Sequence, residues 1–185
     1  MSAVKEPSQS KLKNILIVGC SGGGKSTLAE HLSEMTGLRV IYMDHIYWKP
    51  GWDLRSQEDI TALITKEIQK DGWICEGNNA QTFHLRVPKA RMLIWLDLPR
   101  RTCLWRVIKR TIKYYGKTRE NSPQGCPERF DWDFFKWIWN YNKVSHPKLE
   151  KLYHETEGQL ERYHLRSAQE VDQFIKAMKQ TSSKT

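Results

Sequence analysis

The residues with the clearest chemical signature lie near the amino terminus, in the run Gly-Cys-Ser-Gly-Gly-Gly-Lys-Ser from Gly19 to Ser26. Its spacing matches the pattern G-x-x-x-x-G-K-S/T of a phosphate-binding loop. Glycines let successive backbone N–H groups converge on one anion, because no Cβ atom blocks the positive φ angles that such a loop needs. Lys25 would add positive charge at the β- and γ-phosphates, and the Ser26 hydroxyl would be a ligand for Mg²⁺. The run therefore predicts ATP and Mg²⁺ as cofactors.

A phosphate-binding loop needs a strand before it and a helix after it, and the sequence predicts both. The wholly apolar run 14–18 is typical of a strand buried on both faces, and a helix is expected over 25–36. Strands are expected at 39–43, 73–75, 91–96 and 159–165, and helices at 56–70, 101–115, 131–142, 148–156 and 167–179. This alternation predicts an α/β fold: the three-layer α/β/α arrangement of P-loop NTPases, with a five-stranded parallel sheet and a helical lid.

Length and composition predict one domain. The chain has 185 residues, 39% of them hydrophobic, and lacks an apolar run of the roughly 20 residues that cross a bilayer. We expect a flexible segment at 1–13, a single domain at 14–179 with a lid region at about 111–145, and a tail at 180–185.

The polar N-terminal segment does not resemble a signal peptide, and the four scattered cysteines form no C-x-x-C pair. These features predict a cytoplasmic protein with reduced thiols and no membrane partner.

Positive charge is concentrated in residues 100–119, in a chain whose formal net charge is +9. The basic side chains there are Arg100, Arg101, Arg106, Lys109, Arg110, Lys113, Lys117 and Arg119. Their spacing predicts an amphipathic helix whose apolar stripe contains Leu104, Val107, Ile108, Ile112 and Tyr115. Such a helix suits nucleotide phosphates or nucleic acid, and a merely solvated basic face is the alternative.

Beyond the loop, several tryptophan-rich stretches carry a family resemblance. The sequence resembles the small P-loop kinases related to adenylate kinase, and most closely the bacterial group named DNA topology modulation protein. The resembling stretches are 19–28, 43–52, 73–78, 96–100, 104–110 and 125–127. The resemblance implies the kinase fold and ATP binding, but it does not identify the phosphoryl acceptor.

The resemblance also implies roles for residues outside the loop. Asp44, just past the second strand, would face the acceptor and orient it or accept its proton. Gly77, Asn78 and Arg86 would bind the acceptor, Arg86 through a phosphate. Glu76 would hold Mg²⁺ with Ser26, although aspartate is commoner at that position.

Lid arginines complete the predicted site. Phosphoryl transfer needs cations over the transferred group, and a helix that leads into a mobile loop can deliver them. The family resemblance implies Arg106 and Arg110 as the best candidates, with Arg119 third. The residues with expected catalytic roles are Lys25, Asp44, Arg106, Arg110 and Arg119. Those expected to bind the nucleotide are Gly19, Ser21, Gly22, Gly23, Gly24, Lys25, Ser26, Thr27 and Arg106.

Three other features leave alternatives open. Trp48 and Trp52 could stack on a base or pack against protein, and Asp97 is expected to cap the following helix rather than to bind metal. The loop Leu165–Ser167 lies where related enzymes wrap the adenine.

Taken together, these residues predict an ATP-dependent kinase acting on a small acceptor, a nucleoside monophosphate being the expected one. The first alternative is a DNA topology factor that binds nucleic acid through its basic helix, and the second is an ATP-gated scaffold. A monomer or a homodimer is expected.

Overall fold

The computed structural model describes residue 8 and residues 12–182, so most of the predicted segment 1–13 lies outside the described residues. Five parallel strands form the central sheet. Their spatial order is β2 (Arg39–Tyr42), β5 (Trp73–Glu76), β1 (Asn14–Gly19), β6 (Met92–Leu96) and β7 (Glu161–Leu165). Every residue of β1, β5 and β6 is buried, as expected for strands covered on both faces. The predicted fold class is confirmed.

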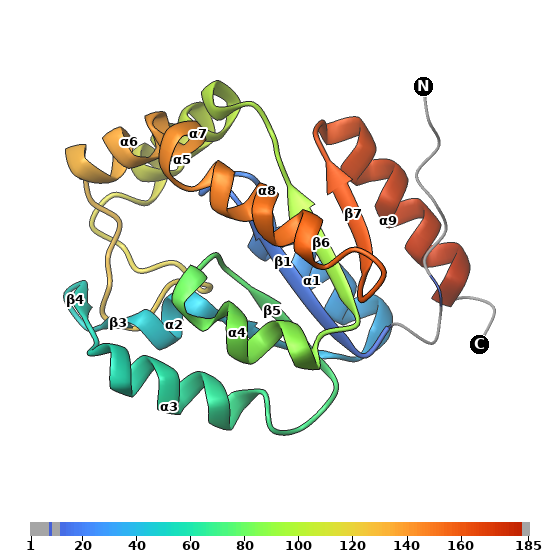
Figure 1. The fold of residues 1–185 in the computed structure, drawn as a ribbon. Helices are drawn as coiled ribbons and strands as arrows, with labels where there is room; N and C mark the ends of the chain where they lie inside the picture. Colours follow the sequence, from blue (N-terminus) through green and yellow to red (C-terminus); the bar gives the residue numbers. More distant parts are fainter. Residues whose placement is uncertain (1–7, 9–11, 183–185) are drawn as a thin grey trace.

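Helices cover both faces of this sheet (Figure 1). On one face, α1 (Lys25–Thr36) packs against α9 (Ala168–Ser182), while α8 (His146–Glu155) lies on the other face against β1 and β6. The remaining covering helices are α3 (Gln57–Glu67) and α4 (Phe83–Arg86), the latter flanked by the 3-10 turns Ala80–Thr82 and Val87–Lys89. Helix α3 begins as predicted, because the Ser56 hydroxyl accepts a 3.1 Å hydrogen bond from the amide of Asp59. Helix α9 reaches Ser182, three residues past its predicted end.

A second group of helices stands beside the sheet: α5 (Arg100–Tyr114), α6 (Trp132–Trp139) and α7 (Tyr141–Val144). The buried line on α5 is Cys103, Val107 and Thr111, at i, i+4, i+8 spacing. The predicted apolar stripe is therefore wrong in its second half, where Ile112 is 63% exposed and Tyr115 is 61% exposed. A polar side chain, Thr111, takes the buried position.

The segment 116–131 between α5 and α6 rests on a small hairpin formed by β3 (Trp48–Lys49) and β4 (Asp53–Leu54) (Figure 1). The Gly51 amide donates to the Gly125 carbonyl at 2.8 Å, and Trp52 Nε1 donates to the Pro127 carbonyl at 2.8 Å. Gly125 has φ +72°, and a Cβ atom there would lie 2.8 Å from the Cβ of Pro50. Of the two alternatives for Trp52, the structure shows packing against protein.

No helix within the described residues is both long and apolar enough to cross a lipid bilayer.

Candidate active site

The phosphate-binding loop turns between the end of β1 and the start of α1. Gly22 and Gly24 adopt φ angles of +79° and +95°, in the left-handed region that favours glycine. A Cβ atom at Gly22 would lie 2.4 Å from the carbonyl oxygen of Cys103, so the loop passes directly against α5. No side chain caps the start of α1 at Gly24. The free N–H groups of that first turn are available to an anion.

The three polar side chains nearest the loop meet at the carboxyl ends of β1 and β5. Lys25 Nζ donates a 3.2 Å hydrogen bond to the Cys20 carbonyl, and Ser26 Oγ donates a 3.1 Å hydrogen bond to Glu76 Oε1. Glu76 is 4% exposed. The lysine is thus held over the loop by a neutral acceptor that a phosphate can replace.

Ser26 and Glu76 also fit a magnesium ion. The ion prefers hard oxygen ligands and usually takes only one or two from the protein, the remainder coming from water and phosphates. A hydroxyl in contact with a carboxylate, beside a phosphate-binding loop, is such a pair. Among residue 8 and residues 12–182 there is no cluster of three or more acidic, histidine or cysteine ligands that would suggest a different metal centre.

Glu76 makes the stability of the metal-free protein depend on pH. Burial raises the pKa of Glu76 from 4.5 to about 7, and the neighbouring Asp44 raises it further against the opposing effect of Lys25. Between these two pKa values the folded state holds a proton that the unfolded state has lost. The free energy of unfolding should therefore fall as the pH rises from about 4.5 to about 7, by up to about 3 kcal/mol, and Glu76→Gln should remove that fall.

Urea unfolding at several pH values, with EDTA present and nucleotide absent, measures this effect. Glu67→Gln is the matched control. Glu67 is solvent-accessible and is ion-paired with Arg39, the first residue of β2. An identical pH slope in the wild type and in Glu76→Gln would contradict the prediction.

Asp44 lies opposite Glu76 on a short helix that the sequence did not predict. The expected strand over 39–43 ends at Tyr42, and Met43–Tyr47 form helix α2. Gly77, with φ +127°, permits this arrangement, because a Cβ atom there would lie 2.6 Å from the Cβ of Met43. The exposed Asp44 carboxylate therefore faces the same space as Ser26 and Glu76.

A cavity of about 490 Å³ joins these groups with three arginines. Arg106 and Arg110 from α5 and Arg119 from the segment 116–131 also line it, and Arg106 Nη1 lies close to the loop, 4.0 Å from where a Cβ atom of Gly24 would be. The predicted site residues that line the cavity are Ser21, Gly22, Gly23, Gly24, Lys25, Ser26, Thr27, Asp44, Glu76, Arg106, Arg110 and Arg119. Gly19, Gly77, Asn78 and Arg86 do not line it.

Comparisons with known proteins agree at the level of fold. The chain is similar to a crystal structure of a gluconokinase from Sinorhizobium meliloti 1021, with a TM-score of 0.53, 15% identity, and 94% and 93% of the two chains covered. It is similar to a shikimate kinase from Acinetobacter baumannii in complex with shikimate, with a TM-score of 0.56, 18% identity, and 94% and 90% covered. A shikimate kinase from Bacteroides thetaiotaomicron gives a TM-score of 0.55, 11% identity, and 91% and 97% covered. The chain has the P-loop kinase fold.

No family model and no curated protein matches the sequence. The expected closeness to the DNA topology modulation group therefore finds no support in these comparisons. Identities of 11–18% establish the fold alone.

Two predicted acceptor ligands have structural roles within this P-loop kinase fold. The Asn78 side chain accepts from the Gly19 amide and donates to the Gly19 carbonyl, each at 2.8 Å, so its amide group is used in fixing the start of the loop. Arg86 is fully buried and donates to the carbonyls of Gly77, Asn78 and Asn79. Arg86 does not line the cavity and both of its Nη atoms already donate to the backbone, so this structure does not support the predicted role of Arg86 as the ligand of an acceptor phosphate.

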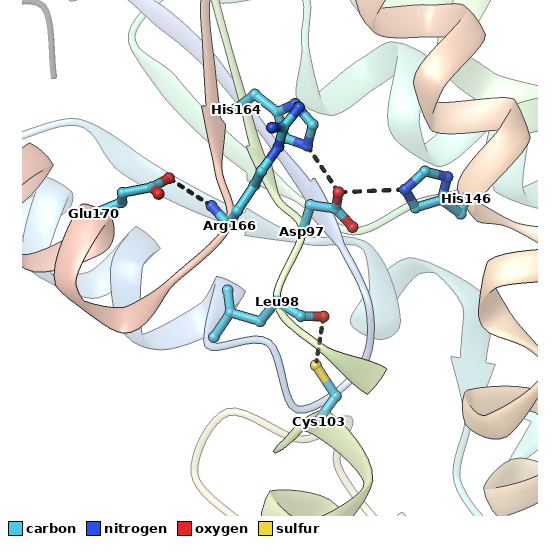
Figure 2. Close-up of polar contacts among 7 residues, drawn as sticks. All are labelled: Asp97, Leu98, Cys103, His146, His164, Arg166 and Glu170. Atoms are coloured by element: carbon cyan, nitrogen blue, oxygen red, sulfur yellow. Dashed lines mark hydrogen bonds and ion pairs between the residues drawn. The ribbon is translucent and has the colours of Figure 1, made fainter. Parts of the chain in front are cut away.

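Asp97 is turned away from the cavity and does not cap α5. Its Oδ2 atom lies 2.8 Å from His164 Nε2 and 3.3 Å from His146 Nε2 (Figure 2). Burial opposes ionisation of Asp97, but the contacts with the two histidines hold the pKa of the carboxyl below its ordinary value. Asp97 therefore ties β6 to β7 and α8, and the predicted capping role is wrong because α5 begins at Arg100, directly after Pro99, without a side-chain cap.

The distal end of the cavity is formed by α9 rather than by the predicted loop 165–167. The Arg166 amide is taken by Glu170 Oε2 at 2.8 Å (Figure 2). The lining residues there are Leu98, Ala168, Val171, Asp172 and Ile175. Their largely apolar faces offer a surface for a base.

Glu128 is the functional residue that sequence reasoning missed. Its carboxylate is 5% exposed, and Oε1 lies 2.9 Å from Arg110 Nε and 2.6 Å from Arg119 Nε, while Oε2 accepts from Thr111 Oγ1 at 3.3 Å. Burial, with the nearby charge of Arg119, lowers the pKa of Arg110. Glu128 therefore holds two like-charged lid arginines together at the cavity. The only signal in the sequence was an acidic residue directly after the Gly-Cys-Pro run.

Replacing Glu128 with glutamine should destabilise the nucleotide-free protein by about 1–3 kcal/mol, because two partly buried arginines lose their counter-charge. Saturating Mg-ATP should shrink that loss, since phosphate oxygens then replace the carboxylate. Urea unfolding with and without Mg-ATP measures both effects. The control is Glu157→Gln. The Glu157 carboxylate pairs with Arg162 but is 74% exposed, so its loss should change the free energy of unfolding by less than about 1 kcal/mol. If Glu128→Gln lowered the free energy of unfolding equally with and without Mg-ATP, phosphate oxygens would not be replacing the carboxylate as partners of the arginines.

Proposed function

We propose that this protein is an ATP-dependent kinase that transfers the γ-phosphoryl group of Mg-ATP to a small acceptor. The observation that carries the proposal is one continuous cavity of about 490 Å³ that joins the phosphate-binding loop to Asp44, Glu76 and three arginines. A P-loop by itself binds phosphates and does not name a reaction. A carboxylate and a cluster of cations facing that loop are the additional groups that phosphoryl transfer needs.

Each group has a defined task in this reaction. Asp44 orients an acceptor oxygen and accepts its proton as that oxygen attacks the γ-phosphorus. The bond to the β,γ-bridging oxygen breaks, and ADP keeps the electron pair. Lys25 and the lid arginines neutralise the charge spread over the equatorial oxygens. Ser26 and Glu76 would hold Mg²⁺, which would supply positive charge to the phosphate groups.

The buried Arg86 bears on the choice of acceptor. A nucleoside monophosphate, the acceptor predicted from the sequence, carries a phosphate that needs cationic ligands, and the expected ligand is not available. A small hydroxylated acceptor needs only a base and hydrogen-bonding groups. Gluconokinase and shikimate kinase, the similar structures, are named for acceptors of that kind. We therefore propose a small hydroxylated acceptor first and a nucleoside monophosphate second.

The test is a panel of small hydroxy acids, sugars, nucleosides and nucleoside monophosphates, each incubated with Mg-ATP and scored by ADP release. The Lys25→Ala protein is the blank. One class should raise ADP release well above the blank. If no acceptor does so, and calorimetry with Mg-ATP gives no heat, the proposal fails.

A second candidate, binding of single-stranded nucleic acid, is favoured by the outer face of α5 and α6. Trp105 is 57% exposed with Lys109 Nζ 5.0 Å from its ring centroid, and Trp139 is 44% exposed with the Arg100 guanidinium 4.5 Å from its ring centroid. Exposed aromatic rings interleaved with cations are typical of stacking platforms. Binding of an oligonucleotide that weakens steeply with salt and is lost in Trp105→Ala would support it, whereas weak binding only at low salt would not.

A further inference from the structure

The small hairpin β3–β4 is the direct continuation of the helix that carries Asp44 (Figure 1). Helix α2 ends at Tyr47, and β3 begins at the next residue, Trp48. The amide of Arg55, which directly follows β4, donates a 2.9 Å hydrogen bond to the Tyr47 carbonyl. The base of the hairpin is therefore fixed to the end of α2 through both of its strands.

The tip of the hairpin is hydrogen-bonded to the segment 116–131. These hydrogen bonds run from the Gly51 amide to the Gly125 carbonyl at 2.8 Å, from Cys126 Sγ to the Lys49 carbonyl at 3.2 Å, and from Trp52 Nε1 to the Pro127 carbonyl at 2.8 Å. The last one is donated by a side chain of the hairpin. A substitution at Trp52 can therefore remove it without removing a backbone donor.

Trp52 has an unusual backbone conformation at this junction. Its φ angle is +64°, in the left-handed region that a bulky residue adopts only at a cost in free energy. Such a conformation persists where the surrounding contacts determine it, and these places are often functional. Here the contacts are the hydrogen bond to Pro127 and the ring of Trp48, which packs edge-on with a centroid distance of 5.7 Å. The position of the indole is thus set from two sides.

The acceptor of the Trp52 hydrogen bond directly precedes Glu128, which holds a lid arginine. Pro127 supplies the carbonyl, and Oε1 of Glu128 lies 2.6 Å from Arg119 Nε. The amide and the carbonyl of Glu128 are also hydrogen-bonded to residues 116–117, at 3.0 and 2.9 Å. Direct contacts therefore lead from the hairpin to the guanidinium of Arg119.

We propose that Trp52 is a positioning residue that holds the Arg119 guanidinium in place relative to the Asp44 carboxylate. Both groups line the cavity, and the hairpin is continuous with the helix of the first and hydrogen-bonded to the segment of the second. The inference rests on the proposed function, in which Asp44 accepts a proton and Arg119 neutralises charge on the transferred phosphoryl group. A misplacement of about 1 Å, caused by a change far from the chemistry, can lower a rate by about a hundredfold.

The first test replaces Trp52 with phenylalanine, which keeps an aromatic ring but has no N–H to donate. With the acceptor found by the panel, kcat should fall by about tenfold to a hundredfold. Mg-ATP affinity measured by calorimetry should change by less than about threefold, because the phosphate-binding loop is untouched. The matched control is Trp132→Phe at the first residue of α6, where the ring is 76% exposed and kcat should stay within about twofold. An unchanged kcat in Trp52→Phe would overturn the inference.

A double-mutant cycle separates the positioning of Arg119 from a general effect on folding. If Trp52 acts through Arg119, then Trp52→Phe should lower kcat by less than about twofold in a protein that already carries Arg119→Ala. An equal fall of kcat in both backgrounds would show that Trp52 acts on another group, and the inference would be wrong.

Amide hydrogen exchange measures the anchoring of the segment without any acceptor. Exchange within residues 116–131 should be about fivefold faster in Trp52→Phe than in the wild type, which corresponds to the loss of one hydrogen bond, and unchanged in Trp132→Phe. Equal exchange in Trp52→Phe and in the wild type would contradict the anchoring. Should Trp52→Phe fail to fold, Gly125→Ala disturbs the same junction, because its Cβ atom would lie 2.8 Å from the Cβ of Pro50. It should lower kcat in the same way, and less so beside Arg119→Ala.

The exchange measurement also separates this inference from the proposed function. A wild type that phosphorylates no acceptor, together with faster exchange of residues 116–131 in Trp52→Phe, would contradict the proposed function while leaving Trp52 as the anchor of the segment.

Discussion

Replacing Lys25 with alanine should lower the rate of phosphotransfer by about a thousandfold, the upper range for loss of one group that stabilises charge in the transition state. The ammonium group lies over the loop, held only by the Cys20 carbonyl at 3.2 Å, and no other lysine lines the cavity formed by the described residues. Arg106, Arg110 and Arg119 also line the cavity, but they reach it from α5 and the segment 116–131 and do not occupy the position of this lysine in the loop. Initial rates of ADP release, with the acceptor found by the panel, measure the loss.

The matched control for Lys25 is Lys66→Ala. Lys66 lies exposed in the last turn of α3, away from the cavity, and its removal should leave the rate within about twofold. A Lys25→Ala protein with more than a tenth of the wild-type rate would show that the loop does not hold the transferred phosphoryl group.

Replacing Asp44 with asparagine should lower kcat by about 10²- to 10⁴-fold, the usual contribution of a general base, while Mg-ATP affinity changes little. Asparagine keeps the shape of the side chain but cannot accept the proton. The variant also has a signature beyond activity, because the charge of Asp44 raises the pKa of Glu76. In the metal-free Asp44→Asn protein, the fall in the free energy of unfolding should therefore occur at lower pH than in the wild type.

Asp53→Asn is the control for Asp44. Asp53 is 70% exposed on β4, and its ion pair with Lys49 is 3.8 Å long, so its loss should change neither kcat nor the pH dependence of stability. An Asp44→Asn protein that keeps its kcat but binds Mg-ATP weakly would assign Asp44 to nucleotide binding instead of to the acceptor.

Residues whose role depends on local spacing could be predicted from the sequence. The glycines and Lys25 act through a loop of eight consecutive residues, and the apolar run 14–18 reveals a strand buried on both faces. Residues whose role depends on a distant partner were predicted poorly. Arg86 and Asn78 have types that suit substrate binding, but the Asn78 amide group and both Nη atoms of Arg86 bind backbone atoms of Gly19 and of residues 77–79.

The amino-acid sequence alone therefore determined the fold class and the phosphate-binding loop. The periodicity of apolar residues, the spacing of the glycines and the order strand–turn–helix are all properties of neighbouring residues. Only the tertiary structure decided that Glu128 contacts both Arg110 and Arg119 and that Asp97 faces two histidines. These partners are separated along the chain, and the packing of helices, strands and the segment 116–131 brings them together. Burial then sets their chemistry, since the same carboxylate, guanidinium or thiol behaves differently once water is removed from around it.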